Sequence, residues 1–514
     1  MTDERSGTVA SRRARRPGHS VVVGGGFGGI AAALRLRAQG GEVTLVDRLP
    51  ELGGRARVFR RGGFTFDAGP TVITAPFLFE ELFALFGKQL EDYATLVPVE
   101  PWYRMMFDDG STFDYGGSVE DTLAEIERFE PRDREGYLTL LAHSRRLFEK
   151  GFEELADRPF SSWRDMLRVL PDLLRLRADR TVFDLVSRHL KDPRLRQAFS
   201  LHPLLVGGNP FTTTSIYSLI HSLERRWGIH FPLGGTGALV SALGRLMEEQ
   251  GVQVRLGTTV ERIDVAAGGS HRGRARGVVL EDGEVISADR VVAAADPAFV
   301  YRHLVEPRHR RRWSDRRIDR MRLSMGLFVL YFGTDRTYPD VAHHTILFGP
   351  RYRELLEDIF QNRELAPDFS LYLHRPTATD PSLAPAGHDG FYVLSPVPHL
   401  GADIDWPVEG PRYRERILEH LEGRLLPNLR RHLVDDFWVT PRYFQDELLS
   451  HRGAGFSVQP ILRQSAWFRF HNRSEDIDGL YFVGAGTHPG AGVPGVLSSA
   501  KVLTRVLADE AVDR

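Results

Sequence analysis

Three glycines and one acid near the start of the chain have the types and spacing needed to bind a dinucleotide. Gly24, Gly26 and Gly29 occupy the glycine positions of a G-x-G-x-x-G pattern. The first glycine permits a tight turn, the second admits a pyrophosphate against the backbone, and the third lets a helix pack on the preceding strand. Asp47 lies 18 residues after Gly29, a spacing that suits an acceptor for a ribose 2′-hydroxyl. An acid at this position repels a 2′-phosphate, so NADP is disfavoured.

Four local elements are needed to hold these residues in place. An apolar run at 21–23 predicts a buried strand, a helix is expected from about 28 to 39, and the run at 43–46 predicts a second strand. The helix N-terminus would present unpaired N–H groups and a partial positive charge to the pyrophosphate. The complete arrangement is far more specific than a lone glycine-rich turn, but it does not by itself distinguish FAD from NAD.

A second glycine block after the second strand favours FAD. Residues 51–56 read Glu-Leu-Gly-Gly-Arg-Ala, with Gly54 and Arg55 near the middle, and residues 66–71 read Phe-Asp-Ala-Gly-Pro-Thr. Glycines here permit a second close approach of the backbone to the diphosphate, and Arg55 supplies positive charge. The alternative is a solvated arginine in a glycine turn. With this block the chain resembles the FAD-containing amine oxidase and carotenoid desaturase superfamily.

The C-terminal region narrows the resemblance. Residues 479–496 read Gly-Leu-Tyr-Phe-Val-Gly-Ala-Gly-Thr-His-Pro-Gly-Ala-Gly-Val-Pro-Gly-Val, which closely resembles the C-terminal signature of bacterial-type phytoene desaturases. The pattern predicts an apolar strand, a glycine turn and a helix that begins near Pro494. Many amine oxidase relatives carry an acid where this chain has Ala485, and that departure favours the desaturase branch. The resemblance extends from about Ser20 to the C-terminus and is most specific at its two ends.

The resemblance implies FAD as the cofactor and assigns residues to it. In this superfamily the C-terminal helix points its positive end at the flavin pyrimidine edge, where it favours the anionic reduced flavin. Val260 lies where family members hold the adenine with backbone groups. The implied FAD contacts are Gly24, Gly26, Gly29, Asp47, Gly54, Arg55, Val260, Gly484, Gly486, Val493, Gly495 and Val496.

The activity that the resemblance implies is desaturation of a carotenoid precursor. The expected substrate is 15-cis-phytoene, and the expected product is neurosporene or lycopene. A related desaturase, ketolase or saturase that acts on another polyene remains open, as does the choice of oxygen or a membrane quinone as electron acceptor. The alternative from a different class is a non-catalytic prenyl-lipid carrier, because the Rab dissociation inhibitors share this superfamily's fold.

Histidine is one candidate for accepting the proton that desaturation releases. His488 lies in the flavin-proximal signature and is the nominated catalytic residue, while His343 and His344 are weaker nominees. A carboxylate or water could also take the proton. The competing interpretation of His488 is a structural histidine bonded to backbone in a glycine- and proline-rich loop.

The organisation that follows is an α/β fold with three lobes. We expect a discontinuous Rossmann-type FAD-binding lobe, a substrate lobe built on a mixed sheet, and a helical lobe that faces a membrane. The predicted ranges are 18–95, 232–300 and 474–514 for the FAD-binding lobe, 96–130 and 301–473 for the substrate lobe, and 131–231 for the helical lobe.

Membrane contact is expected from residues 163–190. Leu167, Leu170 and Leu174, followed by Val182 and Leu185, recur at helical spacing and alternate with arginines. A basic helix with an apolar face can lie among lipid headgroups, whereas an ordinary helix would pack its leucines inward. We therefore expect peripheral attachment at the cytoplasmic face of a membrane, because the implied polyene hydrocarbon must be drawn from a bilayer.

Composition excludes several other classes. The chain has 514 residues, a net charge of −1 and no cysteine, so iron–sulfur clusters and disulfides are excluded and nucleic acid is not an expected partner. The 19 histidines show no metal-binding spacing, so no metal is expected. Arginines at 12–16 precede the apolar run at 20–23 and imitate a secretory signal. Cleavage there would destroy the fingerprint, and so we expect no cleaved signal peptide.

Overall fold

Five parallel strands form the sheet that carries the glycine fingerprint. The computed structural model describes residues 18–160, 162–266 and 273–512, so the arginines at 12–16 lie outside the described residues. The strand order is β20-β13-β1-β2-β9. The strands are β1 (His19–Val23), β2 (Glu42–Val46), β9 (Gln253–Arg255), β13 (Arg290–Ala293) and β20 (Leu480–Phe482). Three distant stretches of the sequence therefore meet in one sheet.

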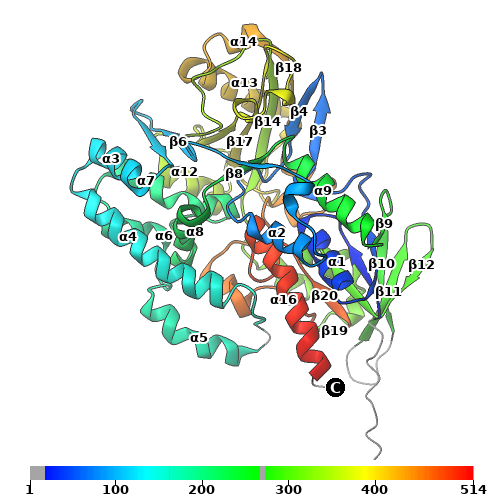
Figure 1. Cartoon of the computed structure of the whole chain (residues 1–514). Coiled ribbons are helices and arrows are strands. Elements are labelled where there is room, and N and C mark those ends of the chain that lie inside the picture. Colours follow the sequence, from blue (N-terminus) through cyan, green and yellow to red (C-terminus); the bar gives the residue numbers. More distant parts are fainter. Residues whose placement is uncertain (1–17, 161, 267–272, 513–514) are drawn as a thin grey trace, which may run out of the picture.

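Helices from both ends of the chain pack beside one another on this sheet (Figure 1). Helix α1 (Phe27–Ala38) follows β1, and α16 (Val493–Val512) follows β20. Both confirm the helices that the sequence predicts at 28–39 and from Pro494, within one residue at each expected boundary. Their buried side chains join one core with those of α2 (Phe77–Ala84) and α9 (Thr236–Glu249).

A smaller sheet flanks the first. It contains β10 (Val260–Ala266), β11 (Gly273–Leu280), β12 (Val285–Ser287) and β19 (Ile477–Asp478). Two further pairs are the hairpin of β3 (Val58–Arg61) with β4 (Phe64–Asp67) and the pair of β5 (Leu96–Pro98) with β8 (His230–Pro232). The strands β4 and β8 lead into segments that reach the site described below.

A seven-stranded mixed sheet forms the upper lobe in Figure 1. Its order is β18-β14-β17-β16-β15-β6-β7. The strands are β6 (Tyr103–Met106), β7 (Thr112–Tyr115), β14 (Gly326–Thr334), β15 (His344–Leu347), β16 (Leu371–His374), β17 (Asp389–Val397) and β18 (Leu433–Val439). The segment 102–115 joins this sheet through the parallel pair β15–β6, as the sequence predicts.

Alternate residues of β14 divide the core of this lobe into two faces. Phe328 and its alternate neighbours pack with α13 (Trp406–Arg424), and the ring of Phe328 lies 5.0 Å from that of Tyr413. Leu327 and Val329 point to the opposite face, toward the helical lobe. This period-two pattern covers one face of the sheet with a helix and leaves the other for the cavity.

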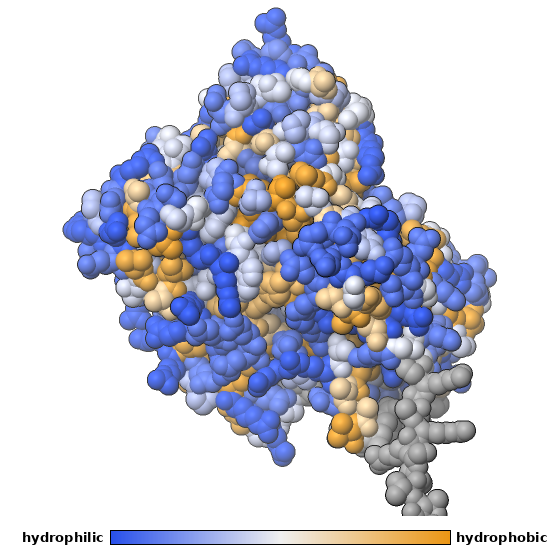
Figure 2. All heavy atoms as spheres, in the orientation of Figure 1, coloured by the Kyte–Doolittle hydropathy of each residue, from blue (hydrophilic) through white to orange (hydrophobic). Residues whose placement is uncertain are grey.

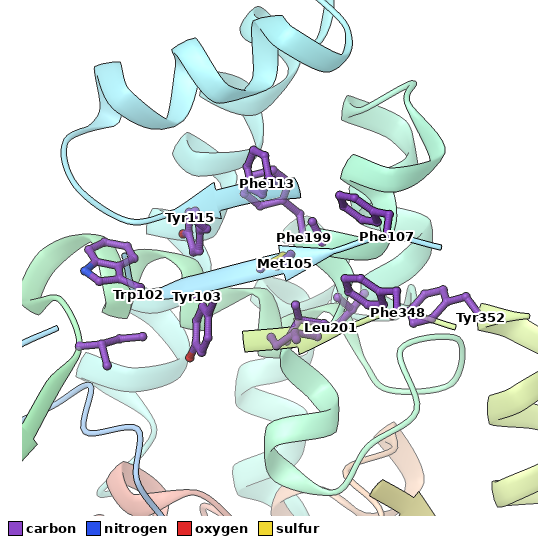
Figure 3. Packing of buried hydrophobic residues seen from close by; sticks show 14 of the residues in the cluster. Trp102, Tyr103, Met105, Phe107, Phe113, Tyr115, Phe199, Leu201, Phe348 and Tyr352 are labelled. Carbon is purple, nitrogen blue, oxygen red and sulfur yellow. The ribbon is translucent and has the colours of Figure 1, made fainter. Parts of the chain in front are cut away.

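The helical lobe lies on the left in Figure 1. Its helices are α3 (Val119–Phe129), α4 (Asp133–Phe148), α5 (Trp163–Arg175), α6 (Val182–His189), α7 (Pro193–Ser200) and α8 (Leu219–Trp227). Figure 3 shows Phe113 and Tyr115 of β7 beside Phe199 of α7. The Phe113 and Phe199 rings meet edge to face at 5.6 Å, so the sheet and the helical lobe share one core.

The remaining helices are short. They are α10 (Pro297–Phe299), α11 (Asp315–Asp319), α12 (Tyr352–Glu357), α14 (Leu429–His432) and α15 (Pro441–Asp446). Among the described residues, no helix has the length and apolar content needed to cross a membrane.

The prediction that the apolar residues of 163–190 share one helical face is wrong, because this range forms two helices, α5 and α6. The chain turns between α5 and α6, where Arg177 has a φ of 59°. Val182 and Leu185 of α6 are buried in the core, whereas Leu167 and Leu174 of α5 are each 52% exposed. Periodicity alone cannot detect a turn that keeps the helical spacing on both sides.

Replacement of Gly29 by alanine should disrupt the fingerprint. A Cβ at Gly29 would lie 1.9 Å from the carbonyl oxygen of Gly24, so α1 would have to move away from β1. We expect about 1–3 kcal/mol lower stability, the usual range for overpacking, together with flavin-poor protein. Thermal unfolding and the flavin absorbance per protein measure both effects.

Gly423→Ala is the matched control, because Gly423 is an exposed residue of α13 whose added Cβ would meet no atom within 4 Å. Removing a helical glycine should leave stability equal or slightly higher. Full flavin content and unchanged stability in Gly29→Ala would contradict the prediction.

Candidate active site

A cavity of about 590 Å³ extends from the glycine fingerprint to the helical lobe. One end is lined by Gly24 and Gly26, and the other by apolar side chains of α5 and of the seven-stranded sheet, such as Leu173 and Leu394. All three lobes contribute to the wall. The cavity therefore joins a backbone-lined polar end to a hydrocarbon-lined end.

The two glycine blocks lie against each other at the polar end. Gly53 N–H donates to the carbonyl oxygen of Gly25 at 2.9 Å, and Gly26 pairs with Gly53 as an isolated parallel bridge. A Cβ on Gly54 would lie 3.4 Å from the Cα of Gly26. Gly24 has a φ of 110° and Gly53 a φ of 113°, conformations that favour glycine. Side chains are thus kept out of a concave backbone surface that a pyrophosphate can approach.

Asp47 ends β2 and lines the cavity. Its Oδ2 accepts a hydrogen bond from Gly25 N–H at 2.6 Å, and its Oδ1 accepts one from Leu49 N–H at 2.8 Å. Burial raises the pKa of this carboxyl, and the two backbone N–H groups oppose that rise. A carboxylate has about four acceptor sites, so two remain for ribose hydroxyls. Val260 lines the same end of the cavity, where the resemblance places the adenine.

Arg55 supplies a buried positive charge at this end. Its guanidinium donates to Ser450 Oγ, while its Nε has no hydrogen-bond partner among the described residues. Burial lowers the pKa of Arg55 and the nearby Asp296 raises it, but a guanidinium remains charged in proteins. A buried cation with an unused donor needs an anion, and the adjoining glycine surface is where a diphosphate fits.

The C-terminal signature closes the cavity from the opposite side. Gly484 has a φ of 101°, and its N–H donates to Ser499 Oγ of α16 at 2.8 Å. A Cβ on Gly28 would lie 3.1 Å from the Cα of Gly484, so the start of α1 contacts this turn. Val493, Gly495 and Val496 line the cavity at the beginning of α16. The positive ends of α1 and α16 therefore converge on one site.

Two of the nominated glycines contact protein instead of lining the cavity. Gly29 packs under Gly24, the role expected of the third fingerprint glycine, and a Cβ on Gly486 would lie 2.3 Å from Pro297. Arg469, which is buried, donates to the carbonyl oxygens of Gly486 at 3.1 Å and Ala485 at 2.7 Å. Asn472 donates to the carbonyl oxygen of His488 at 3.0 Å. Through these bonds Arg469 and Asn472 organise the loop that leads to α16.

His488 lines the cavity, but its ring is engaged with backbone. Its Nε2 donates to the carbonyl oxygen of Leu155 at 3.0 Å, which leaves Nδ1 as the acceptor of a neutral imidazole. Burial lowers the pKa of His488 to about 4. The backbone bond matches the structural interpretation of this residue, and the low pKa makes it a weak base. The nomination of His488 as proton acceptor stays a prediction.

His343 and His344, the weaker candidates for the proton acceptor, lie behind the cavity wall. His343 and His344 are buried and do not line the cavity, and burial together with neighbouring histidines lowers the pKa of each well below its usual value. His344 Nδ1 is 2.7 Å from the hydroxyl of Tyr372, which does line the cavity. These histidines can reach the cavity only through other side chains.

Glu224 is a carboxylate in the cavity wall that sequence reasoning missed. It is fully buried and accepts hydrogen bonds from Tyr103 Oη at 3.1 Å and from His202 Nε2 at 2.9 Å. Burial raises the pKa of Tyr103 well above its usual value, so this phenol stays a donor. The signal in the sequence is one acid at the end of the stretch 215–224, in which apolar residues alternate with serine and histidine, a pattern that also fits an ordinary amphipathic helix.

The residues around the polar end of the cavity fit FAD, and together with the fold they define the class of protein. Positive-φ glycines at 24, 53 and 484, an unused donor on Arg55 and two helix N-termini surround one cavity, and Asp47 lies where a ribose would be held. A mixed α/β fold with this arrangement is that of a flavin-dependent oxidoreductase.

Comparisons with known proteins identify the family. Residues 27–502 match the family model described as flavin containing amine oxidoreductase. The chain is 50% identical to a phytoene desaturase (lycopene-forming) of Pseudescherichia vulneris, covering 96% of this chain and 99% of the relative. It is 45% identical to a phytoene desaturase (neurosporene-forming) of Rhodobacter capsulatus, covering 97% and 95%.

The fold has solved counterparts. A putrescine oxidase variant from a redesign of cofactor binding superposes with a TM-score of 0.63 at 14% identity, over 97% of this chain and 99% of that one. The chain therefore belongs to the flavin-containing amine oxidoreductase family, in the branch that contains the bacterial phytoene desaturases. It is an FAD-dependent enzyme, which excludes the carrier alternative.

Replacing His488 separates its two interpretations. Glutamine keeps a donor near Leu155 but cannot act as a base, whereas alanine leaves the buried Leu155 carbonyl unpaired, at about 1–3 kcal/mol. We expect His488→Gln to retain FAD and most turnover, and His488→Ala to be less stable. Flavin absorbance, thermal unfolding and product formation measure this. Flavin-loaded His488→Gln without turnover would instead establish His488 as the proton acceptor.

The pH dependence of the melting temperature gives a second measurement of the state of His488. Because the folded pKa of His488 is about 4 and its ordinary value is about 6.5, the stability linked to its neutral form is lost as pH falls through that interval. The wild-type melting temperature should therefore fall more than that of His488→Gln over the same interval.

Proposed function

We propose that the enzyme desaturates 15-cis-phytoene by successive dehydrogenations to neurosporene or lycopene. The observation that carries this proposal is the continuity of the cavity from the cofactor cradle into a long apolar end. The names of the relatives support the same substrate, because they are phytoene desaturases that form lycopene or neurosporene, at 45–50% identity.

The apolar end suits a hydrocarbon chain. Its lining includes Met166 and Val169 of α5, Met325 and Leu327 before and on β14, and Ile346 of β15. A hydrocarbon offers no hydrogen-bonding groups, so it is held by shape, dispersion and exclusion of water. Glu224, a polar group in this region, is already hydrogen-bonded within the protein.

Desaturation removes a hydride from one carbon and a proton from its neighbour. Bound FAD supplies the hydride-accepting chemistry. The protein's part is to hold the polyene against the cofactor end, exclude water and take up the proton. Two groups in the cavity wall can receive that proton, Nδ1 of His488 and the carboxylate of Glu224, with water as the third possibility. The acceptor that reoxidises the flavin is proposed to be oxygen or a membrane quinone.

Pigment from phytoene-accumulating cells that express the chain tests this proposal. We expect the extract to change from colourless to a visible polyene spectrum whose band positions report the number of double bonds introduced. Cells with the flavin-poor Gly29→Ala variant are the matched control and should stay colourless. An unchanged extract from cells that contain soluble, flavin-loaded protein would contradict the proposed substrate and direct the search to another carotenoid desaturase, ketolase or saturase activity.

We further propose that helix α5 lies on a lipid surface. Its inner face carries Met166, Val169 and Leu173, which line the cavity, and its outer face carries exposed apolar side chains. These are Trp163, Leu167, Leu170 and Leu174, with exposed fractions of 57%, 52%, 40% and 52%. On the face of the molecule seen in Figure 2, apolar residues form several separate patches on a largely hydrophilic surface.

The charges on α5 support the same placement. Arg164, Arg168 and Arg175 are exposed around the outer leucines, and Arg177 follows the helix. A helix with leucines and tryptophan between arginines can insert shallowly among anionic headgroups. Because α5 also lines the apolar end of the cavity, a substrate leaving the bilayer would enter directly. We propose peripheral attachment at the cytoplasmic face of the membrane on these grounds.

Aspartate at Leu167 and Leu174 should weaken binding to liposomes that contain anionic lipid. Both side chains are exposed and neither lines the cavity, so FAD content should not change. The matched control places aspartate at Leu85 and Leu138, which are 40% and 43% exposed on other helical segments. Co-sedimentation measures the effect. Equal sedimentation of both double variants and the wild type would contradict attachment through α5.

A further inference from the structure

Three buried histidines meet behind the cavity wall. His344 begins β15 and is the register partner of His374 at the end of β16, and His343 directly precedes β15. Their ligand nitrogens all lie within 4.8 Å of one another. His344 and His374 are 0% exposed and His343 is 4% exposed.

The polar atoms at the centre of this cluster lack partners. His343 Nε2, His344 Nε2 and both ring nitrogens of His374 have no hydrogen bond within the described ranges, and the same holds for Asp67 Oδ2. Asp67 Oδ2 lies 3.6 Å from His374 Nε2. Buried polar atoms are nearly always satisfied, so unpaired nitrogens on three histidines that lie this close together indicate an occupant.

The outer atoms of the same side chains are fixed by hydrogen bonds. His343 Nδ1 is 2.6 Å from Thr379 Oγ1, and His344 Nδ1 is 2.7 Å from Tyr372 Oη. Asp67 Oδ1 accepts from Thr236 N–H at 2.7 Å. These bonds fix the side chains and leave Nε2 of His343, Nε2 of His344 and Oδ2 of Asp67 without a partner in the described part of the chain. Metal-ligating histidines are held in this way, with one nitrogen on an outer partner and the other on the ion.

We propose that His343, His344 and His374 form a binding site for one divalent transition-metal ion of the zinc class, with Asp67 beside His374 at one edge of the cluster. Three imidazole nitrogens are donors that zinc takes in a four-coordinate site, and a water molecule can complete such a set. Ligand atoms on such a tetrahedron, with bonds of about 2.0–2.1 Å, lie about 3.3 Å apart. The three histidine nitrogens lie within 4.8 Å of one another, so movement of the rings toward a common centre completes the coordination.

The second histidine cluster in the described chain differs in this respect. His202 Nε2 is bonded to Glu224, His221 Nε2 is 2.9 Å from the carbonyl oxygen of Phe199, and Glu224 also accepts from Tyr103. Both carboxylate oxygens of Glu224 are engaged with protein, and each histidine keeps a single unpaired nitrogen, His202 Nδ1 and His221 Nδ1, so this cluster offers fewer free donor atoms.

The ion in the proposed site would be structural. Its ligands do not line the cavity, and they hold β15 and β16 together at the end of their pair, next to Asp67 at the end of β4. The histidine cluster lies directly behind Tyr372, which is hydrogen-bonded to His344 and lines the cavity.

Metal content of the tag-free, FAD-loaded protein tests the site. We expect about one zinc-class ion per chain by elemental analysis. After chelation, one equivalent of Co²⁺ should produce the visible bands of a four-coordinate cobalt site at wavelengths beyond flavin absorption. Removing the ion should lower the melting temperature while FAD stays bound. His344→Phe and His374→Phe should abolish uptake, and His388→Phe, which alters a half-buried histidine outside the cluster, should not.

Two outcomes would overturn the proposal. One is wild-type protein that holds no metal and takes up no equivalent of Zn²⁺ or Co²⁺, which would leave bound water as the occupant. The other is undiminished uptake by both cluster variants. If those variants do not fold, anomalous scattering at the zinc edge from wild-type crystals decides, since the ion must appear between the three imidazoles.

Discussion

The close approach of backbone to backbone at the cofactor end is the constraint on which the rest of the structure depends. Gly26 and Gly53 form a parallel bridge, and a Cβ on Gly28 would crowd the backbone of Gly484 at 3.1 Å, so three chain segments meet here through their backbones. That packing aims the N-termini of α1 and α16 at one point and leaves a surface of N–H groups with few side chains. It also explains why a buried, partly unpaired Arg55 is tolerated there.

The second organising feature is a cavity that changes character along its length. At one end its walls are backbone, an acid and an arginine, and at the other they come from the inner face of β14 and the inner face of α5. The seven-stranded sheet makes this possible because its two faces are distinct, with α13 covering one and the cavity lying against the other. A cofactor with a charged tail and a substrate without polar groups can then share one enclosed space.

The cofactor end could be predicted well from the sequence because its signals are local. Turn glycines, a strand-ending acid and a helix start are read within a few residues, and β1, α1, β2 and α16 appear where expected. The substrate end of the cavity could be predicted less well from the sequence, since its lining comes from residues spread over several elements. Glu224 gave no distinctive pattern, and His343, His344 and His374 meet only through the β15–β16 register. The prediction of one apolar helical face at 163–190 is wrong because the helical spacing of apolar residues continues across the turn between α5 and α6.

The five-stranded sheet has a consequence for how the chain is made. Strand β1 leaves the ribosome early, but its neighbour β13 and the outer strand β20 follow hundreds of residues later, and α16 last of all. During synthesis the apolar side of α1 lacks its final cover, and contacts of such long sequence separation form slowly. The dinucleotide cradle can therefore close only after α16 has been synthesised, which makes the growing chain dependent on protection from aggregation until that point.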